Sequence, residues 1–278
     1  MSRQDDLELA LRLGDIADSI TGRRFRARDL RVHEKPDRTP VTDADTAVET
    51  AVREALSSAR PDDAFAGEET GGSVTAGRTW MVDPIDGTKN FLRGVPVWAT
   101  LIALLENGRP SVGVVSAPAL RSRWWAAVQQ GAWLRRGAPD STPLPLHVSG
   151  NTRLADAYLS TTSTRTWDTF HSREAYLRLA EACWEDRAFG DFLQHCMVAE
   201  GTLDIAAEPV VNPWDITALQ ILVEEAGGIC TDLLGASPQS GTGALSANPQ
   251  LHELALKALS DPPGSTFGGV TQRKGPSC

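Results

Sequence analysis

The segment Trp80-Met81-Val82-Asp83-Pro84-Ile85-Asp86-Gly87-Thr88-Lys89-Asn90-Phe91 carries two carboxylates three residues apart, directly after a short apolar run. The run is typical of a strand that leaves the core, and Asp83-Pro84 predicts a turn at its end. Hard cations such as Mg²⁺ bind carboxylates, waters and the oxygens of substrate phosphates. Gly87 and Thr88 add backbone N–H groups and a hydroxyl that suit a phosphate or a water. The segment therefore predicts half of a site for metal-assisted hydrolysis of a phosphate ester.

Two further acidic clusters decide how this segment is interpreted. An Asp-x-x-Asp after a strand is, taken alone, more often a turn followed by a helix cap. Here Gly67-Glu68-Glu69 lies upstream and Trp214-Asp215 lies far downstream. Metal sites are commonly built from separate segments that converge, so we expect the three clusters to meet.

These segments resemble the signatures of the inositol monophosphatase-like phosphatases. Residues 80–91 look like the first signature, and Trp214-Asp215 with residues 223–228 resembles the second. Gly67-Glu68-Glu69 matches the family's acidic pair, and residues 41–49 match the segment that holds its water-activating aspartate. The segments occur in the family's order, and the resemblance runs over about residues 5 to 258.

The resemblance implies an α+β fold with layers in the order αβαβα. The spacing of apolar residues agrees with two halves. Residues 1–150 predict N-terminal helices on an antiparallel sheet, and residues 151–259 predict a mixed α/β half with the substrate-side residues and the last metal ligand. Residues 260–278 are rich in Pro, Gly, Ser and Thr and predict a disordered tail.

The apolar spacing also places the individual elements. Helices are expected at residues 5–21, 43–56, 172–184, 191–200, 216–226 and 251–259, and strands at 97–105, 111–115, 123–128, 131–134, 144–148, 157–160 and 203–206. Residues 106–109 predict a hairpin turn, and residues 35–40, with two prolines, predict a loop.

The metal ligands that we expect are the carboxylates of Glu68, Asp83, Asp86 and Asp215. The resemblance adds the backbone carbonyl of Ile85 and implies two or three Mg²⁺ ions per site. A phosphate monoester needs its charged oxygens clamped and a water made nucleophilic. Two metals that share one carboxylate do both, and Asp83 is the natural bridge.

The resemblance makes Thr88 and Asp45 the water-activating pair, with Glu68 counted as catalytic beside them. Asp43 is the neighbouring alternative to Asp45, although an N-cap is the more frequent role for an aspartate there, and either Thr42 or Asp43 is expected to cap the helix that follows. The N–H groups of Gly87 and Thr88 are expected to hold the substrate phosphate.

On the leaving-group side, Arg187, Asp191 and Glu208 fall in segments that face the organic part of the substrate in this family. Carboxylates suit an ammonium group or an imidazole, yet they also bind sugar hydroxyls. Asp191 could equally serve as a helix N-cap. His195 falls in the middle of a predicted helix and is interpreted as structural.

Within the family, the chain most resembles bacterial histidinol-phosphate phosphatases, through residues 94–98, 115–118, Trp124-Trp125 and 187–192. The resemblance predicts an Mg²⁺-dependent hydrolase that converts L-histidinol phosphate to L-histidinol in histidine biosynthesis. One alternative is an inositol-1-monophosphatase, or a related sugar or nucleotide phosphatase with the same mechanism. Another is an inactive relative that serves as a binding protein, but none of the expected ligands is missing. The resemblance also implies a homodimer.

Charge and composition limit the partners and the cellular compartment that we expect for this protein. The 278 residues carry a formal net charge of −9, which argues against a nucleic-acid partner. No apolar stretch follows Met1, and no run approaches the ~18 apolar residues of a membrane span, so we expect no signal peptide and no membrane partner. The four cysteines show no metal-binding spacing. These features together predict a cytoplasmic setting, and the motifs and the resemblance add a small phosphorylated substrate as the partner.

Overall fold

The computed structural model describes residues 2–36, 39–240 and 242–260. Its helices are α1 Arg3–Arg24, α2 Asp43–Ala59, α3 Thr88–Arg93, α4 Thr164–Phe170, α5 Arg173–Ala182, α6 Asp191–Ala199, α7 Pro213–Glu225 and α8 Pro249–Ser260. Its strands are β1 Val32–Glu34, β2 Pro40–Thr42, β3 Ala64–Gly67, β4 Arg78–Asp86, β5 Ala99–Glu106, β6 Arg109–Ala117, β7 Ser122–Ala127, β8 Ala132–Arg136, β9 Leu144–Pro145, β10 Tyr158–Ser160, β11 Glu185–Arg187, β12 Ile205–Glu208, β13 Ile229–Thr231 and β14 Ala244–Ala247.

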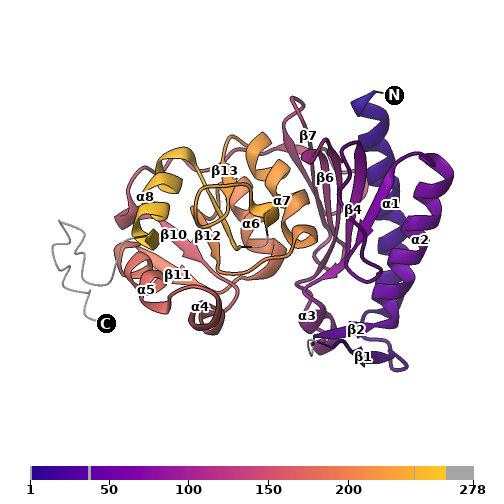
Figure 1. Ribbon diagram of the computed structural model, residues 1–278, viewed down its shortest axis with the longest axis horizontal. Coiled ribbons are helices and arrows are strands. Elements are labelled where there is room, and N and C mark those ends of the chain that lie inside the picture. The colour runs from indigo at the N-terminus through magenta and orange to yellow at the C-terminus, as the bar shows by residue number, and fades with distance from the viewer. Residues whose placement is uncertain (1, 37–38, 241, 261–278) are drawn as a thin grey trace.

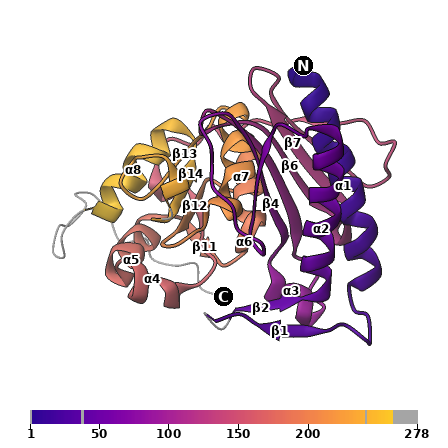
Figure 2. The ribbon, with the colours of Figure 1, turned by 45° about the vertical axis from the view of Figure 1, so that its right-hand side comes forward.

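Helices and sheets alternate in five layers across the molecule (Figure 1). From right to left in that view, α1 and α2 cover a large sheet, α6 and α7 follow, and a smaller sheet is covered by α4, α5 and α8. Seen after a turn of 45°, α6 and α7 still lie between the two sheets (Figure 2). The αβαβα arrangement expected from the sequence is confirmed.

The large sheet has the strand order β3-β4-β5-β6-β7-β8-β9. Its pairs are antiparallel except for β3 with β4, so the expected meander is confirmed. Asn107 and Gly108 link β5 to β6 with φ angles of 53° and 76°, as a two-residue hairpin turn requires. The apolar faces of α1 and α2 pack on this sheet because Leu13, Val48 and their helical neighbours bury against it.

The small sheet has the order β11-β10-β12-β14-β13 and mixes parallel with antiparallel pairs, as expected. Helix α7 packs on both sheets, so apolar residues surround nearly its whole circumference. The largest core cluster accordingly joins Leu101 and Trp124 of the large sheet to Ile216 of α7 and Ala206 of the small sheet. The site described below lies where these layers meet.

The turn expected at Asp83-Pro84 is wrong. Strand β4 continues to Asp86, and its register with β5 shifts between Asp83 and Asp86. Such a bulge accommodates a proline, because Pro84 has no N–H to donate to the ladder. The chain turns instead at Gly87, where φ is 81°.

The elements that the sequence did not reveal are short. They include β1, β2, α4, β11, β13 and β14, each too short to show an apolar period. Pro40 belongs to β2 rather than to a loop, and the expected edge strand at 144–148 is limited to Leu144–Pro145. The predicted tail, residues 261–278, lies outside the described residues. Among the described helices, none is both long and apolar enough to cross a membrane.

Candidate metal centre and substrate cleft

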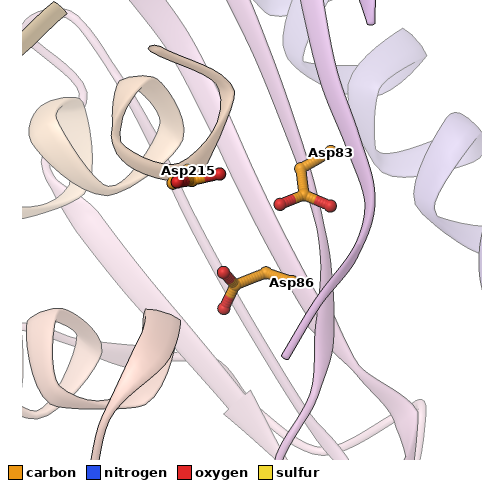
Figure 3. A group of neighbouring side chains, drawn as sticks. All are labelled: Asp83, Asp86 and Asp215. Carbon is orange, nitrogen blue, oxygen red and sulfur yellow. The ribbon is translucent and has the colours of Figure 1, made fainter. Parts of the chain in front are cut away.

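Three aspartates from two distant parts of the chain meet between the layers (Figure 3). Asp83 and Asp86 come from the end of β4, and Asp215 comes from the first turn of α7. One oxygen atom of each carboxylate lies within 4.8 Å of the others. The bulge in β4 matters here because it changes the strand register between Asp83 and Asp86, which both reach the cluster.

Backbone N–H groups hold all three carboxylates in place. The bonds join Asp83 Oδ1 to the N–H of Ile85 (2.9 Å), Asp86 Oδ2 to the N–H of Phe192 (2.7 Å) and Asp215 Oδ2 to the N–H of Asn212 (2.8 Å). Asp86 thereby binds the N-terminus of α6, and Asp215 completes a capping box at the start of α7. The carboxylates are therefore fixed in orientation by the ends of secondary-structure elements.

The electrostatics of the cluster call for a cation. Burial, with the neighbouring carboxylates adding to it, raises the pKa of Asp83 and of Asp86 well above the ordinary value. Burial also raises the pKa of Asp215 to about 7. Like charges so close together are unstable when ionised, and a bound divalent cation removes that penalty. An all-oxygen donor set of this kind fits Mg²⁺ or a similar hard ion.

Glu68 lies at the end of β3 and lines the same cleft as the three aspartates. Its carboxylate accepts from Lys35 Nζ at 2.7 Å, and the same ammonium lies 2.8 Å from Glu69. Burial alone would lower the pKa of Lys35, but the two glutamates outweigh it and raise that pKa. Lys35 was missed in the sequence, because a lysine in a loop gives no signal of its partners.

The loop that carries Glu68 is held by Glu49 of α2. Glu49 accepts from the backbone N–H groups of Glu69 and Thr70, both at 2.8 Å, and from the Thr70 hydroxyl. Gly67 makes this approach possible, because a Cβ there would lie 2.4 Å from the Glu49 carboxylate carbon. Glu49, which belongs to the segment that resembles the family, thus holds the loop that carries Glu68 and Glu69.

Of the two expected water-activating residues, Thr88 lines the cleft, whereas Asp45 is fully buried and is not among the residues that line it. Thr88 Oγ1 donates to the carbonyl of Ile85 at 2.9 Å. Asp45 Oδ2 accepts from the backbone and hydroxyl of Thr42, while its buried Oδ1 has no hydrogen-bond partner among the described residues. Burial raises the pKa of Asp45 to about 7, and Glu69 and Glu68 contribute. The role of the pair stays a prediction.

The N-cap of α2 is Thr42, so of the two expected caps Thr42 is confirmed and Asp43 is wrong. Asp43 instead accepts from Arg24 of α1, with Nη2 and Oδ2 2.7 Å apart. A threonine one residue earlier was available as a cap, and the capping box that it forms with Asp45 at N3 favours it.

The acidic residues line an open cleft of about 510 Å³. Gly87, Thr88, Ile85 and Asp191, all expected at the site, line it too. Gly87 has φ 81° and lies so close to the Val97 carbonyl that a Cβ would be 2.9 Å from that oxygen. The sequence did not single out the further lining residues Asn90, Thr162, Ser163 and Asn212.

Asp191 begins α6 in the left-handed region, with φ 47°, a strained conformation for this residue. The N-cap is Gly190, so the expected capping role of the Asp191 side chain is not observed. Its carboxylate accepts instead from Asn90 Nδ2 at 3.0 Å. Burial, followed by the charge of Glu208, raises the pKa of Asp191 to about 6.

The other two expected substrate residues lie differently. Glu208 lines a small cavity of about 70 Å³ that it shares with Asp86, Asp191 and Asp215. The Arg187 guanidinium lies outside the cleft lining, where it pairs with Glu185 at 2.7 Å. The structure therefore brings Asp191 and Glu208 to the cluster of Asp83, Asp86 and Asp215 and places the Arg187 side chain away from it.

Comparison with known proteins agrees with this geometry. Residues 3–262 match the inositol monophosphatase family. A histidinol-phosphatase of Mycobacterium tuberculosis is 55% identical over 256 residues, covering 92% of this chain and 98% of that protein. One of Streptomyces coelicolor is 48% identical, covering 92% and 97%. The structure of an inositol monophosphatase from Zymomonas mobilis matches with a TM-score of 0.81 at 32% identity, covering 93% of this chain and 99% of that one.

Proposed function

The chain belongs to the inositol monophosphatase family, and we infer that it is a histidinol-phosphatase, which hydrolyses L-histidinol phosphate to L-histidinol and phosphate. The observation that carries this function is the arrangement of the cleft. Buried Asp83 and the partly buried Asp86 and Asp215 gather in it, and two more carboxylates, Asp191 and Glu208, stand directly beside them. Such a site suits a substrate with a phosphate at one end and a positive charge at the other.

We propose Mg²⁺ as the cofactor, two or three ions per site, held by Asp83, Asp86, Asp215, Glu68 and the Ile85 carbonyl. When bound, Mg²⁺ neutralises the phosphate oxygens and lowers the pKa of a bound water. The clustering and the raised pKa values of the aspartates support a cation at this place.

The protein's own groups position the reactants. Thr88 and Asp45 orient the attacking water, and the partnerless oxygen of buried Asp45 supports that role. The backbone N–H groups of Gly87 and Thr88 hold the phosphate, at a turn where Gly87 permits close approach. Asp191 and Glu208 receive the ammonium group of the substrate.

We further propose that the enzyme works as a cytoplasmic homodimer in histidine biosynthesis. The resemblance seen in the sequence motifs supports the assembly, and the names of the bacterial relatives support the pathway. Light scattering on the purified protein tests the assembly. A mass that corresponds to one chain would exclude the dimer.

A substrate panel at one Mg²⁺ concentration tests the function. The purified protein is assayed with histidinol phosphate, inositol 1-phosphate and fructose 1,6-bisphosphate. We expect kcat/KM to favour histidinol phosphate by at least about tenfold, the effect of one charge-assisted hydrogen bond. A preference for inositol 1-phosphate would overturn the substrate and leave the metal centre standing. No Mg²⁺-dependent turnover of any phosphate ester would overturn the enzyme class as well.

A further inference from the structure

A buried histidine behind the cleft has one ring nitrogen that lacks a clear partner. His195 of α6 is 1% exposed, and its Nδ1 lies 2.8 Å from the Ser246 hydroxyl in β14. Its Nε2 has no hydrogen-bond partner in the described part of the chain. The nearest carboxylate oxygen is Glu208 Oε1, at 3.5 Å. A buried ring nitrogen aimed at a carboxylate is a costly feature unless the two interact.

A second side chain, that of Gln194, also contacts Glu208 Oε1. Gln194, the residue before His195, is fully buried and donates from Nε2 to Glu208 Oε1. No hydrogen bond to Glu208 Oε2 occurs among the residues that the structure describes. Two successive residues of α6 thus converge on one oxygen of Glu208, while Glu208 lines the small cavity beside Asp191.

Glu208 needs such support because of its surroundings. It interacts repulsively with Asp86, Asp191 and Asp215, which share its cavity. An unsupported carboxylate among three others would turn toward solvent, away from the cavity. Neutral donors at Oε1 hold it against that repulsion.

We propose that His195 is a positioning residue for substrate selection. The Ser246 hydroxyl donates to Nδ1, which leaves the proton on Nε2, and Nε2–H faces Glu208 Oε1 at 3.5 Å and attracts that oxygen electrostatically. Glu208 is thereby fixed with Oε2 available, and together with Asp191 it receives the ammonium group of the substrate. The inference rests on the proposed function, since that function supplies the ammonium group.

The test compares two substrates that differ only in this group. These are L-histidinol phosphate and its analogue without the amine, 3-(imidazol-4-yl)propyl phosphate. His195→Phe keeps the ring volume and removes both nitrogens, and His195→Gln restores a donor near the position of Nε2. In His195→Phe we expect KM for histidinol phosphate to rise about tenfold, with kcat changed much less, and KM for the analogue to rise less. His195→Gln should recover most of the loss.

Because His195→Phe removes the ring nitrogen that contacts the Ser246 hydroxyl, the double variant His195→Phe with Ser246→Ala is measured beside it. Thermal unfolding of each variant shows whether a change in KM comes from lower stability of the fold or from weaker discrimination between the two substrates. His252→Gln is the matched control, since His252 bonds Thr231 on the far side of the small sheet and should leave the substrate ratio unchanged.

Equal rises in KM for both substrates, with no recovery in His195→Gln, would reduce His195 to a core residue and overturn the inference. A wild-type enzyme that turns over both substrates equally well would also overturn it, while leaving the phosphatase activity in place. Failure of the wild type to hydrolyse histidinol phosphate would overturn the proposed function itself.

Discussion

Asp83 is the residue on which the proposed metal centre depends most. It is buried, it has Glu68, Asp86 and Asp215 as acidic neighbours, and its Oδ1 already accepts the N–H of Ile85. We expect Asp83→Asn to lose more than about 90% of turnover, which corresponds to at least ~1.4 kcal/mol of transition-state stabilisation. Without metal the variant should unfold at an equal or higher temperature, because one repelling charge is gone. Steady-state kinetics and thermal unfolding check both parts.

Asp140→Asn, an exposed residue on the large-sheet side, is the control and should match the wild type. An Asp83→Asn enzyme that keeps over a tenth of its activity would contradict the bridging role.

Thr88 and Asp45 can be tested as one unit. Their side chains are bonded to Ile85 and Thr42 rather than to each other, so a shared water would have to join them. Thr88→Ala and Asp45→Asn should each lower kcat by several orders of magnitude, and the double variant should cost little more. A double-mutant cycle measures this, and additive losses would show that the two residues act separately. Asp43→Asn, which removes only the ion pair with Arg24, is the nearby control.

At the scale of the elements, the sequence predicted the helices with periodic apolar residues, but it did not predict the bulge in a strand. Helices α1 and α2 were predictable because apolar residues recur with a helical period over several turns. The continuation of β4 through Pro84 was not, because a bulge depends on the partner strand β5. We expected Asp215 at the site, directly before a helix. It lies instead in the first turn of α7, where its side chain accepts the backbone N–H of the N-cap residue Asn212.

The sequence also predicted which side-chain types gather in the site. It did not predict the residues that hold those side chains in place. Carboxylates next to Gly and Thr suggest a metal and a phosphate by chemistry alone. The contact between Lys35 and Glu68 joins residues 33 positions apart, and the contact between His195 and Glu208 joins a helix to a strand. Such pairs follow from how layers pack, which no local pattern encodes.

The loop between β3 and β4 offers a prediction about an element. Glu49 of α2 anchors this loop through two backbone N–H groups, and the loop carries Glu68. Glu49→Ala leaves those groups without their acceptor, so Glu68 should lose its fixed place. We expect the Mg²⁺ concentration for half-maximal activity to rise at least about tenfold, the range seen when groups that orient metal ligands are removed.

Glu54→Ala is the matched control, because Glu54 is an exposed glutamate of the same helix. Unchanged Mg²⁺ dependence in Glu49→Ala would mean that Glu68 does not bind metal or does not need the anchor.

On the scale of the whole molecule, the five layers concentrate negative charge at one place. Strand β4 brings Asp83 and Asp86, α7 brings Asp215, and α6 brings Asp191 to the same cleft. The protein has a net charge of −9, so the cluster is not offset by a general excess of cations. Folding without metal therefore forces several carboxylates into a buried space, and the fold should respond to pH accordingly.

Burial raises the pKa of Asp215 from 3.8 to about 7, that of Asp45 from 3.8 to about 7 and that of Asp191 from 3.8 to about 6. Between about pH 4 and 7 the metal-free folded state thus binds more protons than the unfolded chain, so its stability falls as pH rises. We expect the Tm of metal-free protein to drop by at least a few degrees from about pH 5 to pH 8. Saturating Mg²⁺ should remove most of that drop. The cation binds the carboxylates in their ionised form and so stabilises the folded state at the higher pH. Thermal unfolding in chelator and in Mg²⁺ across this range measures both, and a metal-free Tm that rises with pH would contradict a buried, mutually repelling cluster.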